Sequence, residues 1–219
     1  MKNWYKIASV LLILYTIFWG LLGPVPRLDI LNETIRNLYY HVPIWFAMIL
    51  MMTKSVFHSL IYLSTNKIKQ DIKAADAAII GFVLSIPGII TGSVWAKFTW
   101  GAFWVKEDPK LNGAALAILI YLGYLVLRSA FNDEIKRARF TSVFNIFAYV
   151  LLIVFIFIYP RMHSSLHPGN GGNPAFGKYD LDNNMRLVFY PAVMGWMMFS
   201  WWLYNIKNRI SIIKTKLHE

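Results

Sequence analysis

Six long stretches without a charged residue constrain this chain more than any other feature of its sequence. Each contains 17 to 21 consecutive residues free of Lys, Arg, Asp and Glu. The stretches are 7–26, 37–53, 77–96, 111–127, 140–160 and 187–206. Because a helix rises 1.5 Å per residue, about 20 residues cross a hydrocarbon core of about 30 Å. In a chain of 219 residues, six such helices leave room only for short connections.

The composition argues against a water-soluble protein. Charged residues make up 15% of the chain and hydrophobic residues 57%, whereas a typical soluble domain carries about 25% charged residues. Six buried helices of a soluble protein would need amphipathic faces and a more charged surface. We therefore predict an all-α polytopic membrane protein, a bundle of six transmembrane helices that forms one integral membrane domain over residues 1–219. The predicted helices are about 6–23, 41–63, 76–94, 111–130, 140–159 and 187–206.

The lysines and arginines are distributed unevenly between the two sides of this predicted bundle. Six spans place both termini on one side, where 13 cations flank the helices, against 8 on the opposite side. The remaining cation, Lys54, lies within a predicted span. This excess predicts cytoplasmic termini. The net charge of +11 is then mostly a topology signal. Because the cations do not cluster in a recognisable binding motif, we expect no nucleic-acid partner.

The second predicted outer loop, 95–110, is dense in tryptophan. Trp95, Trp100 and Trp104 fall within ten residues, with Gly101 and several charged residues between and after them. Since Trp and Tyr settle at the membrane–water interface, an aromatic belt is one interpretation. A platform of flat rings for a large planar ligand is the other. Composition alone leaves both open.

Histidines lie on the same predicted outer face. His41 begins the second predicted helix, and His163 and His167 lie in the third outer loop. Neutral imidazole is a common ligand of haem iron, and one histidine on each side gives a six-coordinate iron. Because the chain has no cysteine, a haem here would be held without thioether bonds. Cations on the same side could pair with its propionates. They are Arg27, Arg36, Lys97, Lys106, Arg161 and Arg186.

Three segments in order resemble the cytochrome c assembly protein family, and within it the six-span haem exporter protein C type. Tyr40-His41-Val42-Pro43 resembles the family's His-Val-Pro at the start of helix two. Trp95-x-x-x-x-Trp100-Gly101-x-x-Trp104, followed by Asp108-Pro109-Lys110-Leu111, resembles the tryptophan-rich signature loop. Leu166-His167-x-Gly169 resembles the second histidine motif before the last helix. The resemblance extends over residues 37–206.

The resemblance implies a role for each matching residue. His41 and His167 match the two axial ligands of the haem iron. The positions that match the haem-contacting loop are Trp95, Trp100, Gly101, Trp104 and Asp108. Two positions depart from the family pattern, because Phe103 and Glu107 stand where tryptophan is usual. The loop is therefore less aromatic than is usual in that family.

The resemblance also implies a function. It implies a bacterial inner-membrane protein that binds haem b non-covalently and transiently, and delivers it at the periplasmic face for c-type cytochrome maturation, with no evident turnover reaction. A periplasmic haem chaperone and other maturation subunits are the implied partners. Two other functions stay open. A b-type electron-carrier subunit would bury its histidines within helices, where only His58 is a candidate. A permease subunit would need a polar pathway through the membrane, where Lys54 is the one charge.

Overall fold

The computed structural model describes residues 3–27, 31–167 and 181–218, and all of its regular structure over these ranges is helical. The long helices are α1 (Trp4–Leu22), α2 (Leu38–Thr65), α3 (Ile68–Trp100), α4 (Pro109–Ser129), α5 (Glu134–Ile153) and α7 (Asn183–His218). A 3₁₀ turn, η1 (Asn32–Asn37), precedes α2. A π-helical turn, η2 (Val154–Ile158), and a short helix, α6 (Tyr159–Met162), continue α5.

Five helical stretches of the described chain are long and apolar enough to cross a membrane. They are Trp4–Leu22, Asn32–Thr65, Ile68–Trp100, Pro109–Ser129 and Glu134–Met162. The sixth predicted span lies within α7, which is not among the five. Its uncharged stretch 187–206 contains three Trp, two Tyr and a Pro, and these residues are less apolar than Leu or Ile. The prediction of an all-α polytopic membrane bundle is confirmed.

The third predicted helix was placed too narrowly, at 76–94. In the structure α3 begins at Ile68 and ends at Trp100. The segment from Trp95 to Trp100 contains neither Gly nor Pro, so the helix continues until Gly101. That residue adopts φ +83° and ends α3 in the left-handed conformation that glycine tolerates best. Trp95 and Trp100 therefore lie on the last turns of a helix, and not in a loop as predicted.

The fifth predicted helix, 140–159, was also placed too narrowly. α5 begins at Glu134, where the Asp133 carboxylate accepts a hydrogen bond from the backbone N–H of Lys136 at 2.8 Å. This contact is a helix N-cap, which satisfies one of the unpaired N–H groups of the first turn. Through η2 and α6 the helical path then continues to Met162.

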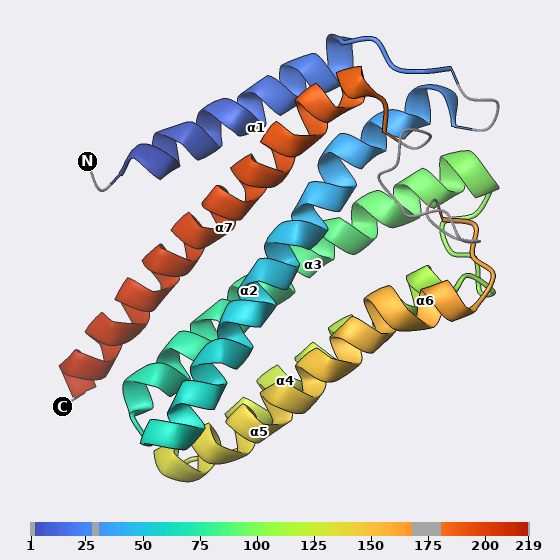
Figure 1. Ribbon diagram of the computed structural model, residues 1–219. Helices are drawn as coiled ribbons and strands as arrows, with labels where there is room; N and C mark the ends of the chain where they lie inside the picture. The colour runs from blue at the N-terminus through green and yellow to red at the C-terminus, as the bar shows by residue number, and fades with distance from the viewer. Residues whose placement is uncertain (1–2, 28–30, 168–180, 219) are drawn as a thin grey trace.

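The helices form three antiparallel pairs (Figure 1). α2 and α3 lie in the centre, α1 and α7 lie together on one side, and α4 and α5 on the other. The connections after α2 and α4 are short, at 66–67 and 130–133. Both of these connections lie at the end of the bundle towards which the two termini run. The end of α3, η1 and α6 lie at the opposite end.

Small residues of α3 let α2 pack closely against it. Gly81, Gly88 and Gly92 lie on the face of α3 that contacts α2. A Cβ atom at these positions would lie 2.8 Å from Met52, 3.0 Å from Trp45 and 2.7 Å from His41, respectively. Membrane helices commonly approach one another through small residues four apart, as at Gly88-x-x-x-Gly92.

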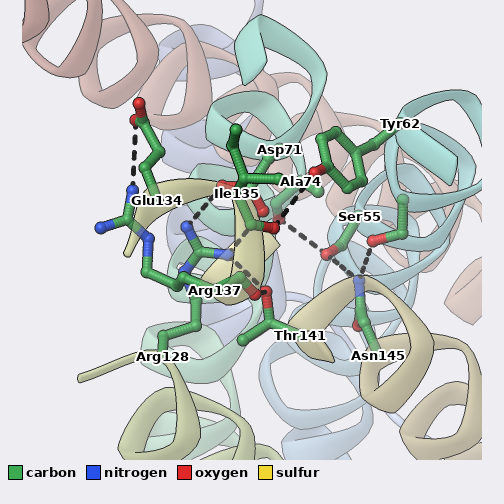
Figure 2. Close-up of polar contacts among 11 residues, drawn as sticks. Ser55, Tyr62, Asp71, Ala74, Arg128, Glu134, Ile135, Arg137, Thr141 and Asn145 are labelled. Carbon is green, nitrogen blue, oxygen red and sulfur yellow. Dashed lines mark hydrogen bonds and ion pairs between the residues drawn. The ribbon is translucent and has the colours of Figure 1, made fainter. Parts of the chain in front are cut away.

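Buried polar contacts join α2, α3, α4 and α5 at the end that holds the α2–α3 and α4–α5 connections (Figure 2). The Arg128 guanidinium of α4 donates to both carboxylate oxygens of Asp71 of α3, at 2.7 and 2.8 Å. It also donates to Thr141 of α5 at 2.8 Å. The Asn145 amide donates to Ser55 of α2 at 2.7 Å. Because a buried charge without its partner is strongly destabilising, this pairing favours one helix register.

The predicted intramembrane residues Lys54 and His58 lie on α2. The Lys54 ammonium lies 3.8 Å from the ring centroid of Trp201 and 4.4 Å from that of Tyr204, both on α7. This is a cation–π arrangement. His58 is buried, and its Nδ1 lies 2.9 Å from Oε1 of Gln70 on α3. Both side chains therefore contribute to helix packing.

Candidate functional site: a histidine and tryptophan cluster

His41 lies near the start of α2, with its ring fixed against α3. Its Nδ1 lies 3.0 Å from the hydroxyl oxygen of Thr91. That hydroxyl also lies 2.8 Å from the carbonyl oxygen of Pro87 and 3.0 Å from that of Gly88. When the Thr91 hydroxyl donates to one of these carbonyl oxygens, as threonine in a helix commonly does, its oxygen accepts from His41 Nδ1–H. The neutral imidazole then presents Nε2 as its unprotonated nitrogen.

The close approach of His41 to α3 requires glycine at position 92. A Cβ atom there would lie 2.7 Å from Cε1 of the imidazole, too close for an unshifted ring. Trp45, one turn along α2, packs edge-on to the same imidazole with ring centroids 6.1 Å apart. The position of His41 is therefore determined by both helices of the central pair.

His167 lies beyond α6 and packs against the two tryptophans at the end of α3. Its ring centroid lies 4.8 Å from that of Trp100 and 5.9 Å from that of Trp95. The two indoles contact each other edge-on, with centroids 5.0 Å apart. We call His167, Trp95 and Trp100 the aromatic cluster. It presents an imidazole on an apolar aromatic surface.

Asp108 begins α4 as its N-cap. One carboxylate oxygen, Oδ1, accepts hydrogen bonds from the backbone N–H groups of Lys110 and Leu111, both at 3.0 Å. Pro109 occupies the first helical position, where its missing N–H costs nothing. The Asp-Pro sequence thus accounts for the local structure at the start of α4.

The same carboxylate holds the segment that carries His167. Its second oxygen, Oδ2, accepts from the Ser165 hydroxyl at 2.7 Å and from the Leu166 backbone N–H at 3.0 Å. The Nδ1 atom of His167 lies 3.1 Å from Oδ1. The two atoms are in close contact without a formed hydrogen bond. Asp108 therefore connects α4 to the aromatic cluster.

The environment of Asp108 favours its ionised form. Burial by itself raises the pKa of the carboxyl group. The nearby His167 ring, with hydrogen bonds from Leu111 and Ser165, outweighs burial and holds the pKa of Asp108 below its ordinary value. Because the pKa is lower in the folded than in the unfolded chain, the carboxylate stabilises the fold above a pH of about 4. This contribution is lost as the pH falls through the folded-state pKa.

The structure brings both predicted iron ligands to one end of the bundle. Thr91 and Gly92, which contact His41, lie about one helical turn before Trp95, which contacts His167. His41 and the aromatic cluster therefore lie at the same end of the bundle, at neighbouring turns of α3.

Other predicted contact residues of the loop lie differently. Trp104 is 36% exposed, and its Nε1 donates to the side-chain oxygen of Asn112 at 3.2 Å. Gly101 has no heavy atom within 4 Å of a built Cβ, so its backbone conformation alone requires glycine. Asp108 is 2% exposed, and its oxygens are occupied by the contacts described above. Asp108 therefore joins α4 to the segment of His167 and does not face the surface of the site.

Two of the six cations considered as propionate partners are held by backbone carbonyls. Arg36 donates to the carbonyl oxygens of Gly20 at 2.8 Å and Gly23 at 2.7 Å, at the end of α1. Lys97 donates to the carbonyl oxygen of Gly101 at 2.9 Å. Gly169, part of the second histidine motif, lies outside the described residues.

Four residues of the site were not anticipated from the sequence. They are Trp45, Thr91, Gly92 and Ser165. A signal for Gly92 existed in the Gly88-x-x-x-Gly92 spacing, which is typical of close helix packing. Ser165 carried none, because its partner Asp108 is 57 residues away along the chain.

Comparison with known proteins gives the family. The family model described as CcmC, Heme exporter protein C, matches residues 1–219. The chain belongs to this family. Among relatives named Heme exporter protein C, the Rhodobacter capsulatus protein is 29% identical over 167 residues, which are 76% of this chain and 68% of the relative. The Paracoccus denitrificans protein is 26% identical over 91% of this chain and 81% of its own length. The Escherichia coli K12 protein is 27% identical over 96% and 83%.

Membership of the Heme exporter protein C family confirms the resemblance found in the sequence. The family model extends over all residues of this site, so the site lies entirely within the matched region. The departures at Phe103 and Glu107 fall in the connection 101–108, beside the aromatic cluster and not within it.

Proposed function

We propose that the chain binds haem between His41 and His167 and hands it on for c-type cytochrome maturation. One observation carries the proposal. An imidazole held by Thr91 lies at the same end of the bundle as a second imidazole packed on two indoles. Haem iron supplies two axial coordination positions, which one histidine from each side can fill.

The residues of the site fit such a cargo. His41 donates its Nδ1 proton to Thr91, which is how metal-bound histidines are commonly oriented. The Nδ1 atom of His167 is buried without a hydrogen-bond partner among the described residues, yet lies 3.1 Å from the Asp108 carboxylate. A small rotation of the ring would form the carboxylate–histidine pair that supports metal ligands. Trp95 and Trp100 supply apolar surface for a flat macrocycle.

The proposed association is non-covalent and transient. Because the sequence has no cysteine, haem b would be held by coordination and packing alone. His41 is fixed by two helices, whereas His167 lies in a connecting segment held through Asp108. Release of the iron by His167 before its release by His41 would allow haem to be transferred in two steps. A periplasmic haem chaperone and other maturation subunits are the proposed recipients and partners.

A spectrum of the purified protein tests this proposal. We expect non-covalent haem with a low-spin, six-coordinate absorption spectrum, because two imidazoles complete the coordination of the iron. Denaturing electrophoresis followed by haem staining should leave the polypeptide unstained, since no thioether bond can form. Folded protein that contains no haem after expression in haem-rich medium would contradict the proposal.

We also propose the orientation in the membrane. The protein would lie in the bacterial inner membrane with both termini in the cytoplasm and the aromatic cluster at the periplasmic face. The support is the excess of lysine and arginine around the predicted terminal side, 13 against 8.

Cysteine labelling tests this orientation on a naturally cysteine-free background. Lys106→Cys, in the connection between α3 and α4, should react with a membrane-impermeant thiol reagent in intact spheroplasts. Lys69→Cys, at the start of α3, is the matched control and should react only after lysis. The opposite labelling pattern would overturn the proposed orientation.

A further inference from the structure

A groove with a volume of about 360 Å³ lies between α1 and α7, near the termini. It is lined by Asn3, Lys6, Ile7, Val10, Leu11 and Trp202. The groove is shallow and open along the surface of the two helices. The two helices diverge towards this end of the bundle, away from the aromatic cluster (Figure 1).

The groove changes from polar to apolar along α1. Its α1 residues recur at spacings of three and four, so they share one helix face. Lys6 lies at the polar end, and Ile7, Val10 and Leu11 follow. From Lys6 to Leu11 the helix rises about 7.5 Å. This apolar face can contact the part of a hydrocarbon chain that lies next to its headgroup.

Aromatic residues indicate the depth of this end in the bilayer. Trp4 and Tyr5 of α1, and Trp201, Trp202 and Tyr204 of α7, gather here. Such residues concentrate at the level of the lipid headgroups. The Asn205 amide donates to the Tyr5 hydroxyl at 3.1 Å and fixes the two helices relative to each other. Lys6 therefore lies near the headgroups, and Leu11 lies deeper.

The charge at the mouth of the groove is unbalanced. The Lys6 ammonium lies 5.7 Å from the ring centroid of Trp202. Within the part of the chain that the structure describes, Lys6 forms no ion pair with a carboxylate. None of the six lining residues is acidic. A cation above an apolar groove is complementary to a negatively charged amphiphile.

We propose that this groove binds one anionic phospholipid. Its phosphate contacts Lys6, and one acyl chain lies along Ile7, Val10, Leu11 and Trp202. The site belongs to the leaflet opposite the aromatic cluster. It does not depend on haem binding, because no residue is shared between the two sites.

Native mass spectrometry of the full chain in detergent tests the proposal. The protein is titrated with dioleoylphosphatidylglycerol and, separately, with dioleoylphosphatidylcholine. We expect one preferred phosphatidylglycerol per chain. Lys6→Gln should weaken its binding about fivefold, since one lysine near a headgroup contributes about that factor. Lys6→Arg should retain binding. Lys214→Gln removes an exposed lysine of α7, is the matched control and should have no effect.

Two further measurements test the acyl chain and the headgroup of the lipid separately. Leu11→Trp fills the groove and should weaken both lipids, whereas soluble glycerol 3-phosphate should not compete. Equal losses in Lys6→Gln and Lys214→Gln would show general surface charge and overturn the site. Equal affinity for both lipids, or displacement by glycerol 3-phosphate, would overturn it as well. If Leu11→Trp does not fold, the Lys6 and Lys214 variants still decide the question.

Discussion

We expect His41→Ala and His167→Ala each to lose the six-coordinate haem spectrum and to abolish cytochrome c maturation. Each substitution removes one of the two proposed axial ligands, and no second histidine is proposed to replace it. His163→Ala should have a much smaller effect. The His163 side chain is exposed and has its own contacts, with Nδ1 3.0 Å from the Tyr159 carbonyl oxygen and the two rings 4.2 Å apart. Absorption spectra and a cytochrome c maturation assay provide the readouts.

Added imidazole distinguishes loss of a ligand from loss of the fold. Imidazole can occupy the vacated axial position, so it should partly restore haem binding in His41→Ala and His167→Ala. A misfolded variant would not respond. A loss in His163→Ala equal to that in His167→Ala, or a normal spectrum in His167→Ala, would show that the ligand assignment is wrong.

The number and type of helices could be predicted from the sequence, but their ends could not. Charge-free stretches report the segment that lies in hydrocarbon, because an unpaired charge there is costly. A helix continues beyond that segment wherever no glycine, proline or competing cap ends it. α3 therefore begins eight residues before the predicted start at 76 and runs on through Trp95 to Trp100. Gly101, with its left-handed backbone, determines the end.

The candidate site could be predicted as far as its residues lie in local motifs. The sequence around His41, the tryptophans and His167 predicted that they share one site, and the structure brings them to the same end of the bundle. The contacts that hold them were not predictable. Thr91 of α3 contacts His41 of α2 where the two helices pack closely at Gly92. This contact depends on the register of α2 against α3. The sequence suggested that Asp108 contacts a ligand, whereas the structure places its carboxylate against Ser165 and Leu166.

Asp108→Ala should therefore disturb the site without removing any proposed ligand. The carboxylate accepts two hydrogen bonds at the start of α4 and two from the segment of His167. Loss of the N-cap costs about 0.5–2 kcal/mol, and each of the two part-buried hydrogen bonds lost from the His167 segment costs about 1 kcal/mol. We expect a total loss of stability on the order of 2.5–4 kcal/mol. Haem binding should weaken at least about tenfold, the factor that corresponds to about 1.4 kcal/mol.

Asp133→Ala is the matched control for this last prediction. Asp133 also begins a helix, α5, but accepts a single backbone hydrogen bond, from Lys136 at 2.8 Å, at the other end of the bundle. Its removal should cost about 0.5–2 kcal/mol and leave the haem spectrum unchanged. Ser165→Ala should be intermediate in stability, because it removes one donor and keeps the Leu166 contact. Thermal unfolding and haem titration measure both quantities. If Asp108→Ala matched Asp133→Ala in both, Asp108 would only cap α4, and His167 would be positioned by Trp95 and Trp100 alone.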